Sequence, residues 1–369
     1  QLLARIAELQ PDSPVAQMRL GASLMLTGKG DEAGQHLETA LDIDPEFQQA
    51  DILLVLNYLQ KEGFQGAIDA AKAYRLRNIG KVAPYVVLGR TYLAADRHVE
   101  AREAFESALK LEPGNPSTHL SLAQLALVEG DREAARGHYQ AILADHPDHL
   151  TTLLQLAALE ASEQNEEGMV AWLEQAIGEH PAALRPRLML ARYYLGSGRA
   201  DQVTLLFADL NDLQRQSRPV LELTALAQLS TRESVNAQAN LEKLIAENPD
   251  TVQYHYLLAL AAAGAGEQGK ARRELQEAYR LDNEHVPTLV SLARLALTDQ
   301  QQDAFDRYLD DTERWDFTLR YNPTGRIQVF LEILNFTNEP QIEYLGDSSR
   351  PSSIRYTDPI FTIGAKFAL

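Results

Sequence analysis

The sequence contains no cysteine in 369 residues, which excludes disulfide bonds and thiolate metal sites. It also lacks any run of about 18 apolar residues, so no transmembrane helix is predicted. Basic residues are scarce, because 34 Lys and Arg stand against 52 Asp and Glu and leave a formal net charge of −18. Phosphate contacts need a basic surface, so this balance disfavours nucleic acid and anionic lipid as partners.

The first 315 residues repeat with a period of 34, and no insertion is needed to keep the register. The seventh and eighth places of most units hold Leu followed by Gly or Ala, and the twentieth place usually holds Ala. Several units close with a proline at the thirty-second place. The nine units begin at residues 14, 48, 82, 116, 150, 184, 218, 252 and 286.

Each unit is predicted to form two antiparallel helices. Small residues at the eighth and twentieth places, such as Gly89 and Ala101, let the two helices approach closely. Large residues near the eleventh and twenty-fourth places, such as Tyr92 and Phe105, fill the space between neighbouring units. The closing proline ends the second helix. One unit cannot bury its apolar face alone, so stability is expected to come from stacking.

The third unit, VAPYVVLGRTYLAADRHVEAREAFESALKLEPGN, carries the tetratricopeptide (TPR) pattern in Leu88, Gly89, Tyr92, Ala101, Phe105, Ala108 and Pro113. Residues 1–315 therefore resemble the TPR family, which implies an all-α fold, a right-handed superhelical solenoid of α-α hairpins. The resemblance places nine TPR units in residues 14–315. Because Pro11 lies 34 residues before Pro45, residues 1–13 are expected to be the end of a truncated repeat. Long bacterial arrays of this kind resemble the TPR lipoproteins and export subunits of exopolysaccharide systems.

The resemblance implies a concave groove for partners, lined by the second, fifth, ninth, twelfth and thirteenth places of each first helix. The ninth place holds arginine in the third, sixth and ninth units, and most other units place Ala or Leu there. An apolar groove with spaced guanidinium groups is expected to bind a protein or peptide through its carbonyl or acidic groups. Alternatively, these arginines pair with acids on adjacent helices. The candidate partner-binding residues are Arg90, Gln124, Arg185, Arg192 and Arg294.

From residue 316 the helical period gives way to strand-like runs at 317–321, 326–334 and 359–369. The first two runs are separated by Asn-Pro-Thr-Gly, and a loop rich in Gly, Asp, Ser and Pro precedes the third. In the last run, apolar residues recur at every second place, which is typical of a strand with one face in a nonpolar medium. We therefore expect a short β-strand segment after the helical array.

The string LEILNFTNEPQIEYLG, followed by an Arg-containing loop and FTIGAKFAL, resembles the closing strands of TonB-dependent outer-membrane receptors. It also resembles the signal by which barrel-assembly machinery recognises its clients. Three strands cannot close a barrel, so residues 316–369 are expected to pair with another chain, fold back on the solenoid, stay disordered in isolation or be a fusion fragment. The signal-like residues are Phe361, Ile363, Gly364, Lys366, Phe367 and Leu369, with Leu369 standing where an aromatic is usual.

Two further motifs are interpreted as turns between helices. GAGEQG at 264–269 matches the dinucleotide-binding glycine pattern, but a helix and not a strand is predicted before it. DHPDH at 145–149 groups His146 and His149 with two Asp, but its proline closes a unit. No catalytic triad or carboxylate pair stands out, so we expect no cofactor, no metal and no enzymatic activity.

The sequence thus predicts a non-enzymatic TPR scaffold of the Gram-negative envelope, located in the periplasm or at the outer membrane. Its partner is expected to be a protein bound along the groove, and its tail is expected to associate with an outer-membrane barrel protein or its assembly machinery. The absence of cysteine is compatible with this location. Three alternatives stay open: a fragment of an outer-membrane transport or exopolysaccharide export protein, a chimera of a TPR protein with TonB-dependent receptor strands, and a cytoplasmic adaptor.

Overall fold

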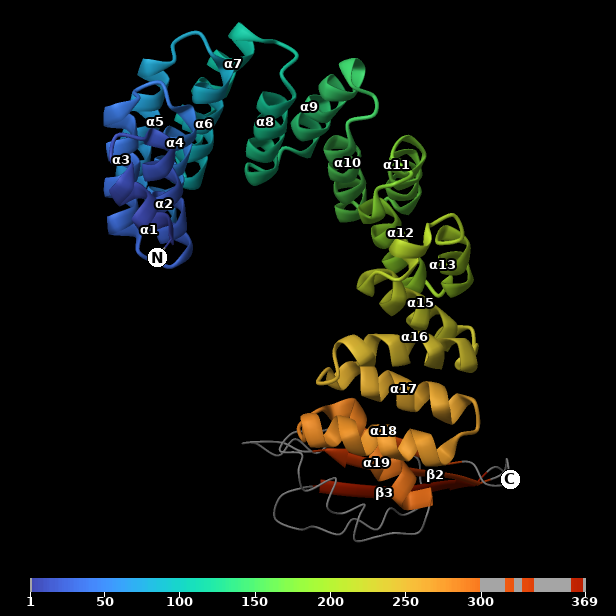
Figure 1. Ribbon diagram of the computed structural model, residues 1–369. Coiled ribbons are helices and arrows are strands. Elements are labelled where there is room, and N and C mark those ends of the chain that lie inside the picture. Colours follow the sequence, from blue (N-terminus) through green and yellow to red (C-terminus); the bar gives the residue numbers. More distant parts are fainter. Residues whose placement is uncertain (1, 299–315, 322–326, 335–359, 368–369) are drawn as a thin grey trace. The chain divides into compact units, whose positions relative to one another are not determined.

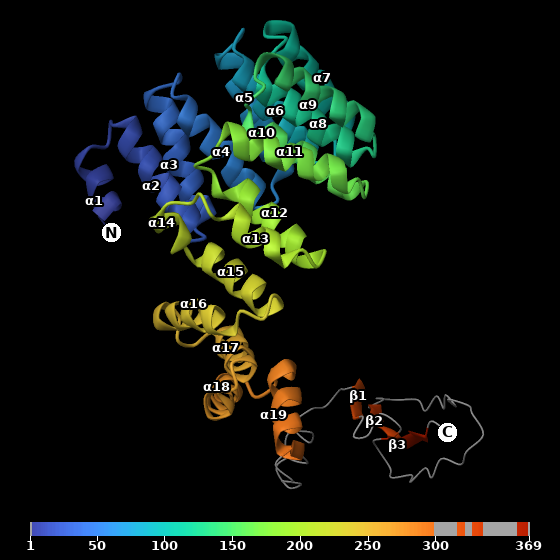
Figure 2. The same cartoon turned by 90° about the vertical axis from the view of Figure 1, so that its right-hand side faces the viewer.

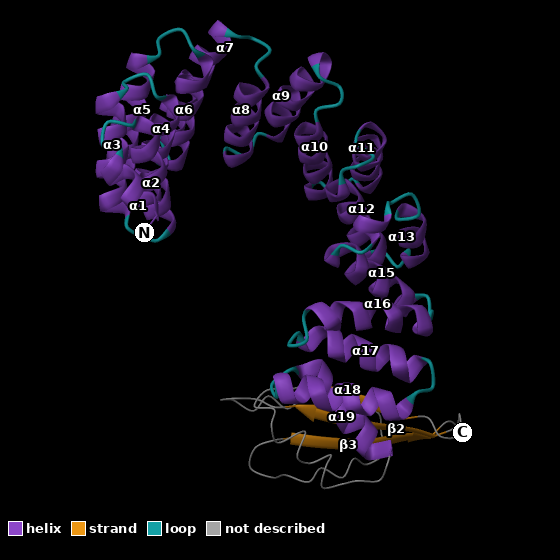
Figure 3. Ribbon diagram, viewed as in Figure 1, coloured by secondary structure: helices purple, strands orange, loops and turns teal. Residues whose placement is uncertain are grey.

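The computed structural model describes residues 2–298, 316–321, 327–334 and 360–367 (Figure 1). The chain divides into two compact units, Gln1–Leu190 and Ala191–Leu369. The described elements of the first unit are all helices, whereas the second unit holds helices and three strands (Figure 3). None of the described helices combines the length and the hydropathy that a bilayer span requires.

The first unit consists of one helix, α1 (Leu2–Leu9), followed by five pairs of helices that contact each other. In Figure 2, the first of these pairs, α2 with α3, follows α1 at the N-terminal end of the chain. The pairs are α2 (Pro14–Leu26) with α3 (Gly30–Ile43), α4 (Gln48–Gln60) with α5 (Phe64–Arg77), α6 (Val82–Ala94) with α7 (His98–Leu111), α8 (Pro116–Val128) with α9 (Arg132–Asp145), and α10 (Leu150–Ser162) with α11 (Glu166–Glu179).

The helix α12 (Leu184–Gly196) runs across the boundary between the units. The later helices are α13 (Ala200–Leu206), α14 (Asp212–Arg215), α15 (Arg218–Ser230), α16 (Ser234–Glu247), α17 (Val252–Gly264), α18 (Gln268–Leu281) and α19 (Val286–Thr298). From Pro14 to Val286, the first helices of successive repeats begin 34 residues apart. The right-handed sense of the solenoid and the division at residue 315 stay predictions.

Local sequence signals start several of these helices. The side chains of Ser13 and Asn115 accept hydrogen bonds from the backbone N–H groups three residues further on, at 3.3 and 3.0 Å. The residue after each cap is a proline, Pro14 or Pro116, at the start of the helix. An N–H group at this position would have no partner within the helix, so the proline sacrifices no hydrogen bond. These caps hold the helix starts in the register of the repeat.

The two helices of a repeat approach each other at small residues, as the sequence predicts. A Cβ atom added to Gly89 on α6 would lie 2.4 Å from Cε1 of Phe105 on α7. The same addition at Gly21 would lie 2.8 Å from Cγ of Leu37 on the paired helix. Ala101, at the twentieth place of the third repeat, is fully buried. The contact between the helices therefore leaves no room for larger side chains at these places.

The hydrophobic core runs from one repeat into the next. One cluster of buried side chains includes Val55 on α4, Ala67 on α5, Val86 on α6, Phe105 on α7 and Leu122 on α8. It therefore combines residues of three successive repeats. This arrangement is what stacking requires, because a single pair of helices cannot cover its own apolar surface.

The turn between the two helices takes a left-handed backbone conformation at the fifteenth place of each of the first eight repeats. The N–H group one residue later donates to the carbonyl five residues back, which satisfies the end of the first helix. Glycine adopts this conformation without steric cost, and it occupies four of the eight places. The places are Gly28, Glu62, Asp96, Gly130, Gln164, Gly198, Arg232 and Gly266, with φ between 56° and 82°.

The sixth repeat departs from the predicted pair of helices, because its second helix, α13, ends at Leu206. A new four-residue helix, α14, begins after Asn211, whose side chain accepts a hydrogen bond from the N–H of Gln214 at 2.9 Å. The side chain of Gln214 in turn accepts from the N–H of Asn211 at 3.2 Å. This reciprocal cap competes with continuation of α13. Phe207 and Leu210 lie between the two helices and stay buried.

The three strands β1 (Asp316–Tyr321), β2 (Ile327–Leu334) and β3 (Ile360–Phe367) form an antiparallel sheet in chain order. In the register of β2 and β3, Phe361 is opposite Ile333 and Phe367 is opposite Ile327. Of the signal-like residues, all but Leu369 lie in β3, and Leu369 lies outside the described residues. The resemblance of this segment to outer-membrane receptors stays a prediction.

The close approach at Gly89 predicts opposite effects of the same substitution at two glycines. Gly89→Ala should lower the free energy of unfolding by about 1–3 kcal/mol, because its methyl group overlaps the ring of Phe105. Gly137→Ala, in the interior of α9 with no atom within 4 Å of the new Cβ, should raise it by about 0.5–1 kcal/mol. Urea unfolding followed by circular dichroism measures both, and equal shifts would contradict the packing described.

Candidate functional site

The first helices of the first four repeats form a continuous layer in the first unit. α2 contacts α4, α4 contacts α6, and α6 contacts α8, while α10 contacts α9, the second helix of the repeat before it. The sequence predicts the groove on these first helices. We call it the first-helix face and define it as the second, fifth, ninth, twelfth and thirteenth places of α2, α4, α6, α8 and α10.

The first-helix face is apolar and open to solvent at several large side chains. Only one of its 25 places carries a charge, in a chain whose formal net charge is −18. Contact of such leucines with water is unfavourable and raises the free energy by roughly 25 cal/mol for each Å² of apolar surface exposed. The large apolar side chains most exposed there are Leu26 (89%), Val128 (56%), Leu56 (47%), Val15 (42%) and Leu127 (37%). Exposed apolar side chains on several first helices of one unit favour contact with another apolar surface.

The one charge on the first-helix face is Arg90, and hydroxyl groups hold its side chain. Its Nε donates to Oγ of Ser121 at 2.9 Å, and its Nη2 donates to Oγ of Ser117 at 3.3 Å. Both serines lie on α8, in the next repeat. Within the described residues no carboxylate forms an ion pair with Arg90, and desolvation of the guanidinium lowers its pKa. A guanidinium has five N–H donors, so Arg90 retains donors for a ligand.

The other predicted binding residues are all exposed on first helices. Gln124 occupies the ninth place of α8, next to the repeat that carries Arg90. Arg185 lies on the part of α12 that belongs to the first unit. Arg192 and Arg294 belong to the second unit, on α12 and α19. The role of these five residues in binding stays a prediction.

In three repeats, a polar side chain at the fourth place of the repeat links it to the loop that follows the preceding repeat. Each side chain hydrogen-bonds a backbone carbonyl in the loop before its repeat and a side chain nineteen residues further on, on the second helix. The same geometry recurs with different chemical groups, so its role is to fix the stacking of the repeats. The three sets are Gln17 with Pro11 and His36, His119 with Pro113 and His138, and His255 with Pro249 and Glu274.

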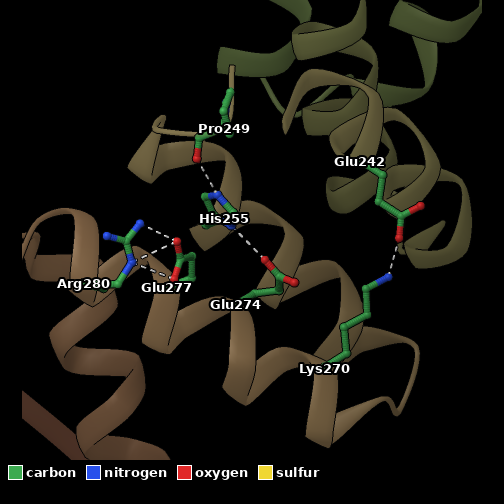
Figure 4. A network of polar contacts seen from close by, with 7 residues as sticks. All are labelled: Glu242, Pro249, His255, Lys270, Glu274, Glu277 and Arg280. Atoms are coloured by element: carbon green, nitrogen blue, oxygen red, sulfur yellow. Dashed lines mark hydrogen bonds and ion pairs between the residues drawn. The ribbon is translucent and has the colours of Figure 1, made fainter. Parts of the chain in front are cut away.

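Figure 4 shows this arrangement at the buried His255 on α17. Its Nε2 donates to the carbonyl of Pro249 at 2.9 Å, and its Nδ1 lies 2.8 Å from Oε2 of Glu274. Two further ion pairs lie close by, Lys270 with Glu242 at 2.6 Å and Arg280 with Glu277 at 2.6 Å. Both ring nitrogens of His255 are engaged, so no nitrogen is left for a substrate or a metal.

The two motifs that resemble chemical sites have structural roles. His149 of the DHPDH segment caps α10, because its Nδ1 accepts from the N–H of Thr152 at 3.3 Å. Gly266 of GAGEQG is one of the left-handed turn residues, and the helix α17 precedes it. In the part of the chain that the structure describes, no three His, Cys, Asp or Glu residues are placed to hold a metal ion.

The His119–His138 contact predicts that acid destabilises the fourth repeat. Burial, the facing His119 and Arg102 lower the pKa of His138. The unfolded chain therefore binds a proton more readily, and the stability due to neutral His138 is lost as the pH falls below about 6.5. The backbone amides of α9 should be less protected from hydrogen exchange at pH 5.5 than at pH 7.5, once the intrinsic pH dependence of exchange is corrected for. His138→Gln should reduce this difference, while His146→Gln, an exposed control, should keep it.

Profiles of the tetratricopeptide repeat match two parts of the chain. One covers residues 92–165, and another covers residues 52–116 and 223–285. No curated protein sequence matches the chain. The matched segments lie in both compact units.

Several solved structures resemble the chain. A thermophilic TPR protein of Thermus thermophilus is 22% identical and covers 49% of this chain and 98% of its own, with a TM-score of 0.40. A TPR protein from Parabacteroides merdae ATCC 43184 is 18% identical and covers 71% and 98%, with a TM-score of 0.40. PilW, a type IV pilus biogenesis factor, is 15% identical and covers 57% and 97%, with a TM-score of 0.42.

The profile matches and the helix pairs that begin every 34 residues lead to the same assignment. The chain contains tetratricopeptide repeats, and the described elements of residues 2–298 are all helices.

Proposed function

We propose that this chain is a non-enzymatic scaffold that binds a protein partner on the first-helix face of its TPRs. The exposed apolar side chains of that face carry the proposal, because a partner that covers them removes apolar surface from water and so lowers the free energy. Arg90 supports it, since its remaining donors suit a carbonyl or carboxylate of the partner. The polar groups that resemble catalytic residues, such as His255, are engaged in joining repeats.

We further propose that the scaffold works in the periplasm or at the outer membrane of a Gram-negative bacterium. The resemblance of residues 316–369 to outer-membrane receptor strands supports this location, and the absence of cysteine is compatible with it. The same resemblance suggests an outer-membrane barrel protein as an associate of the tail. Immunoblotting of fractionated source cells tests the location. Recovery in the cytoplasmic fraction alone would overturn it.

A single substitution on the first-helix face should weaken binding without unfolding the chain. Leu56→Asp places a charge on the exposed apolar surface of α4. Binding peptides are first selected from a displayed random library with the intact chain as target. These peptides should bind the Leu56→Asp variant at least about tenfold more weakly, because apolar anchors dominate such interfaces. Fluorescence anisotropy measures the affinity, and circular dichroism should show unchanged helix content.

The matched control for this experiment is Leu76→Asp. Leu76 is 62% exposed on α5, a second helix, so the same change of charge falls outside the first-helix face. Peptides should bind this variant as they bind the intact chain. Equal affinities for Leu56→Asp and the intact chain would remove the proposed site.

A further inference from the structure

The exposed apolar side chains of the first-helix face lie mainly at one end of the first helices. We call the ninth, twelfth and thirteenth places of α2, α4, α6, α8 and α10 the apolar band. None of its fifteen residues is buried, and Arg90 is its single charge. The most exposed apolar residues of the first-helix face, apart from Val15, belong to this band. It is made of Ala22, Met25, Leu26, Leu56, Leu59, Gln60, Arg90, Leu93, Ala94, Gln124, Leu127, Val128, Ala158, Ala161 and Ser162.

Across these five repeats, the segments that directly follow the apolar band contain more acidic than basic residues. We call the next six places of each repeat, residues 27–32, 61–66, 95–100, 129–134 and 163–168, the acidic edge. It holds eleven acidic and four basic side chains, a net charge of −7. Because each segment directly continues its first helix, the edge borders the band in every repeat. The loops at the opposite end, residues 10–13, 44–47, 78–81, 112–115, 146–149 and 180–183, carry a net charge of −4.

Some acids of the acidic edge have no ion-pair partner among the described residues. Five of its acids pair with Lys or Arg, namely Asp31, Glu32, Glu100, Glu129 and Glu163. Glu62, Glu133 and Glu167 are exposed and form no ion pair with any described residue. An acidic ligand would meet repulsion at both ends of the first helices, whereas a basic ligand would meet attraction.

We propose that the first five repeats bind a cationic amphipathic helix of another protein. Its apolar stripe covers the apolar band, and lysines or arginines beside that stripe face the acidic edge. A helix presents two stripes side by side, whereas a strand presents its two kinds of side chain on opposite faces. The apolar band and the acidic edge lie side by side and not on opposite faces. A bound helix can therefore contact both of them at once, with its apolar stripe on the band and its basic stripe facing the edge. The inference rests on the proposed function, since it names the partner of the same face.

The test uses a synthetic peptide of about 18 residues, composed of Leu and Lys at helical spacing and labelled with fluorescein. Anisotropy titration with the full chain should show saturable binding that weakens as salt is raised. Two matched peptides serve as comparisons: one with Glu in place of every Lys, and one with the same composition in strict alternation. Both should bind at least about tenfold more weakly, because one loses charge complementarity and the other loses the helical stripe.

Substitutions in the chain separate the proposed site from general attraction to an acidic protein. A variant with Glu62→Lys, Glu133→Lys and Glu167→Lys should bind the Leu-Lys peptide about tenfold more weakly. The matched control makes the same change of net charge on exposed second-helix acids and should retain more of the affinity. Its substitutions are Glu103→Lys, Glu106→Lys and Glu174→Lys.

The outcomes distinguish the two proposals. Equal losses in the two triple variants would show attraction to overall charge and would overturn the cationic helix as the partner. Selection of acidic or strand-patterned library peptides that still depend on Leu56 would also overturn it, while leaving the proposed binding face intact. If neither the library peptides nor the Leu-Lys peptide responds to Leu56→Asp, the proposed function and this inference both fail.

Discussion

In most repeats, the close contact between the two helices depends on the small residues that line it. At Gly89, even one methyl group would lie 2.4 Å from the ring of Phe105, and the buried Ala101 belongs to the same core cluster as Phe105. This close approach leaves each pair of helices with apolar surfaces that pack against the neighbouring repeats. The core then runs from repeat to repeat, and the first helices of the first four repeats form one layer. The exposed face of that layer, and hence the proposed binding site, depends on this packing.

The distribution of charge explains how an acidic chain keeps an apolar surface. The acids lie mainly in turns and on second helices, where water solvates them. Arg90 is the only charged residue of the first-helix face. Arg90 is anchored by two serine hydroxyls, which hold its position without neutralising its charge. An apolar surface bordered by a net excess of acids selects against an acidic partner. The proposed partner is therefore basic and amphipathic, in place of the partner with acidic groups that the sequence predicts.

The histidines show why residue type alone is a poor guide to chemistry in a repeat protein. His119 and His255 are buried and hydrogen-bonded, features that active-site histidines share. Yet Gln17 makes the same two contacts at the same place of another repeat. A glutamine cannot replace a catalytic histidine, but it can replace a structural one. The comparison between repeats thus supplies a control that a protein without internal repeats lacks.

The sequence alone predicts the period of 34, the helix starts, the small residues at the helix contact and the turn around Gly266, because each depends on residues close together in the chain or on the neighbouring repeat. It also contains the signal for the break after Leu206, since Asn211 and Gln214 have the spacing of a capping box, but the repeat pattern obscured it. The contacts between Arg90 and the serines Ser117 and Ser121, and the exposure of Leu26 and Leu56, became visible in the structure. These facts depend on how tightly neighbouring repeats stack, a distance that periodicity does not specify.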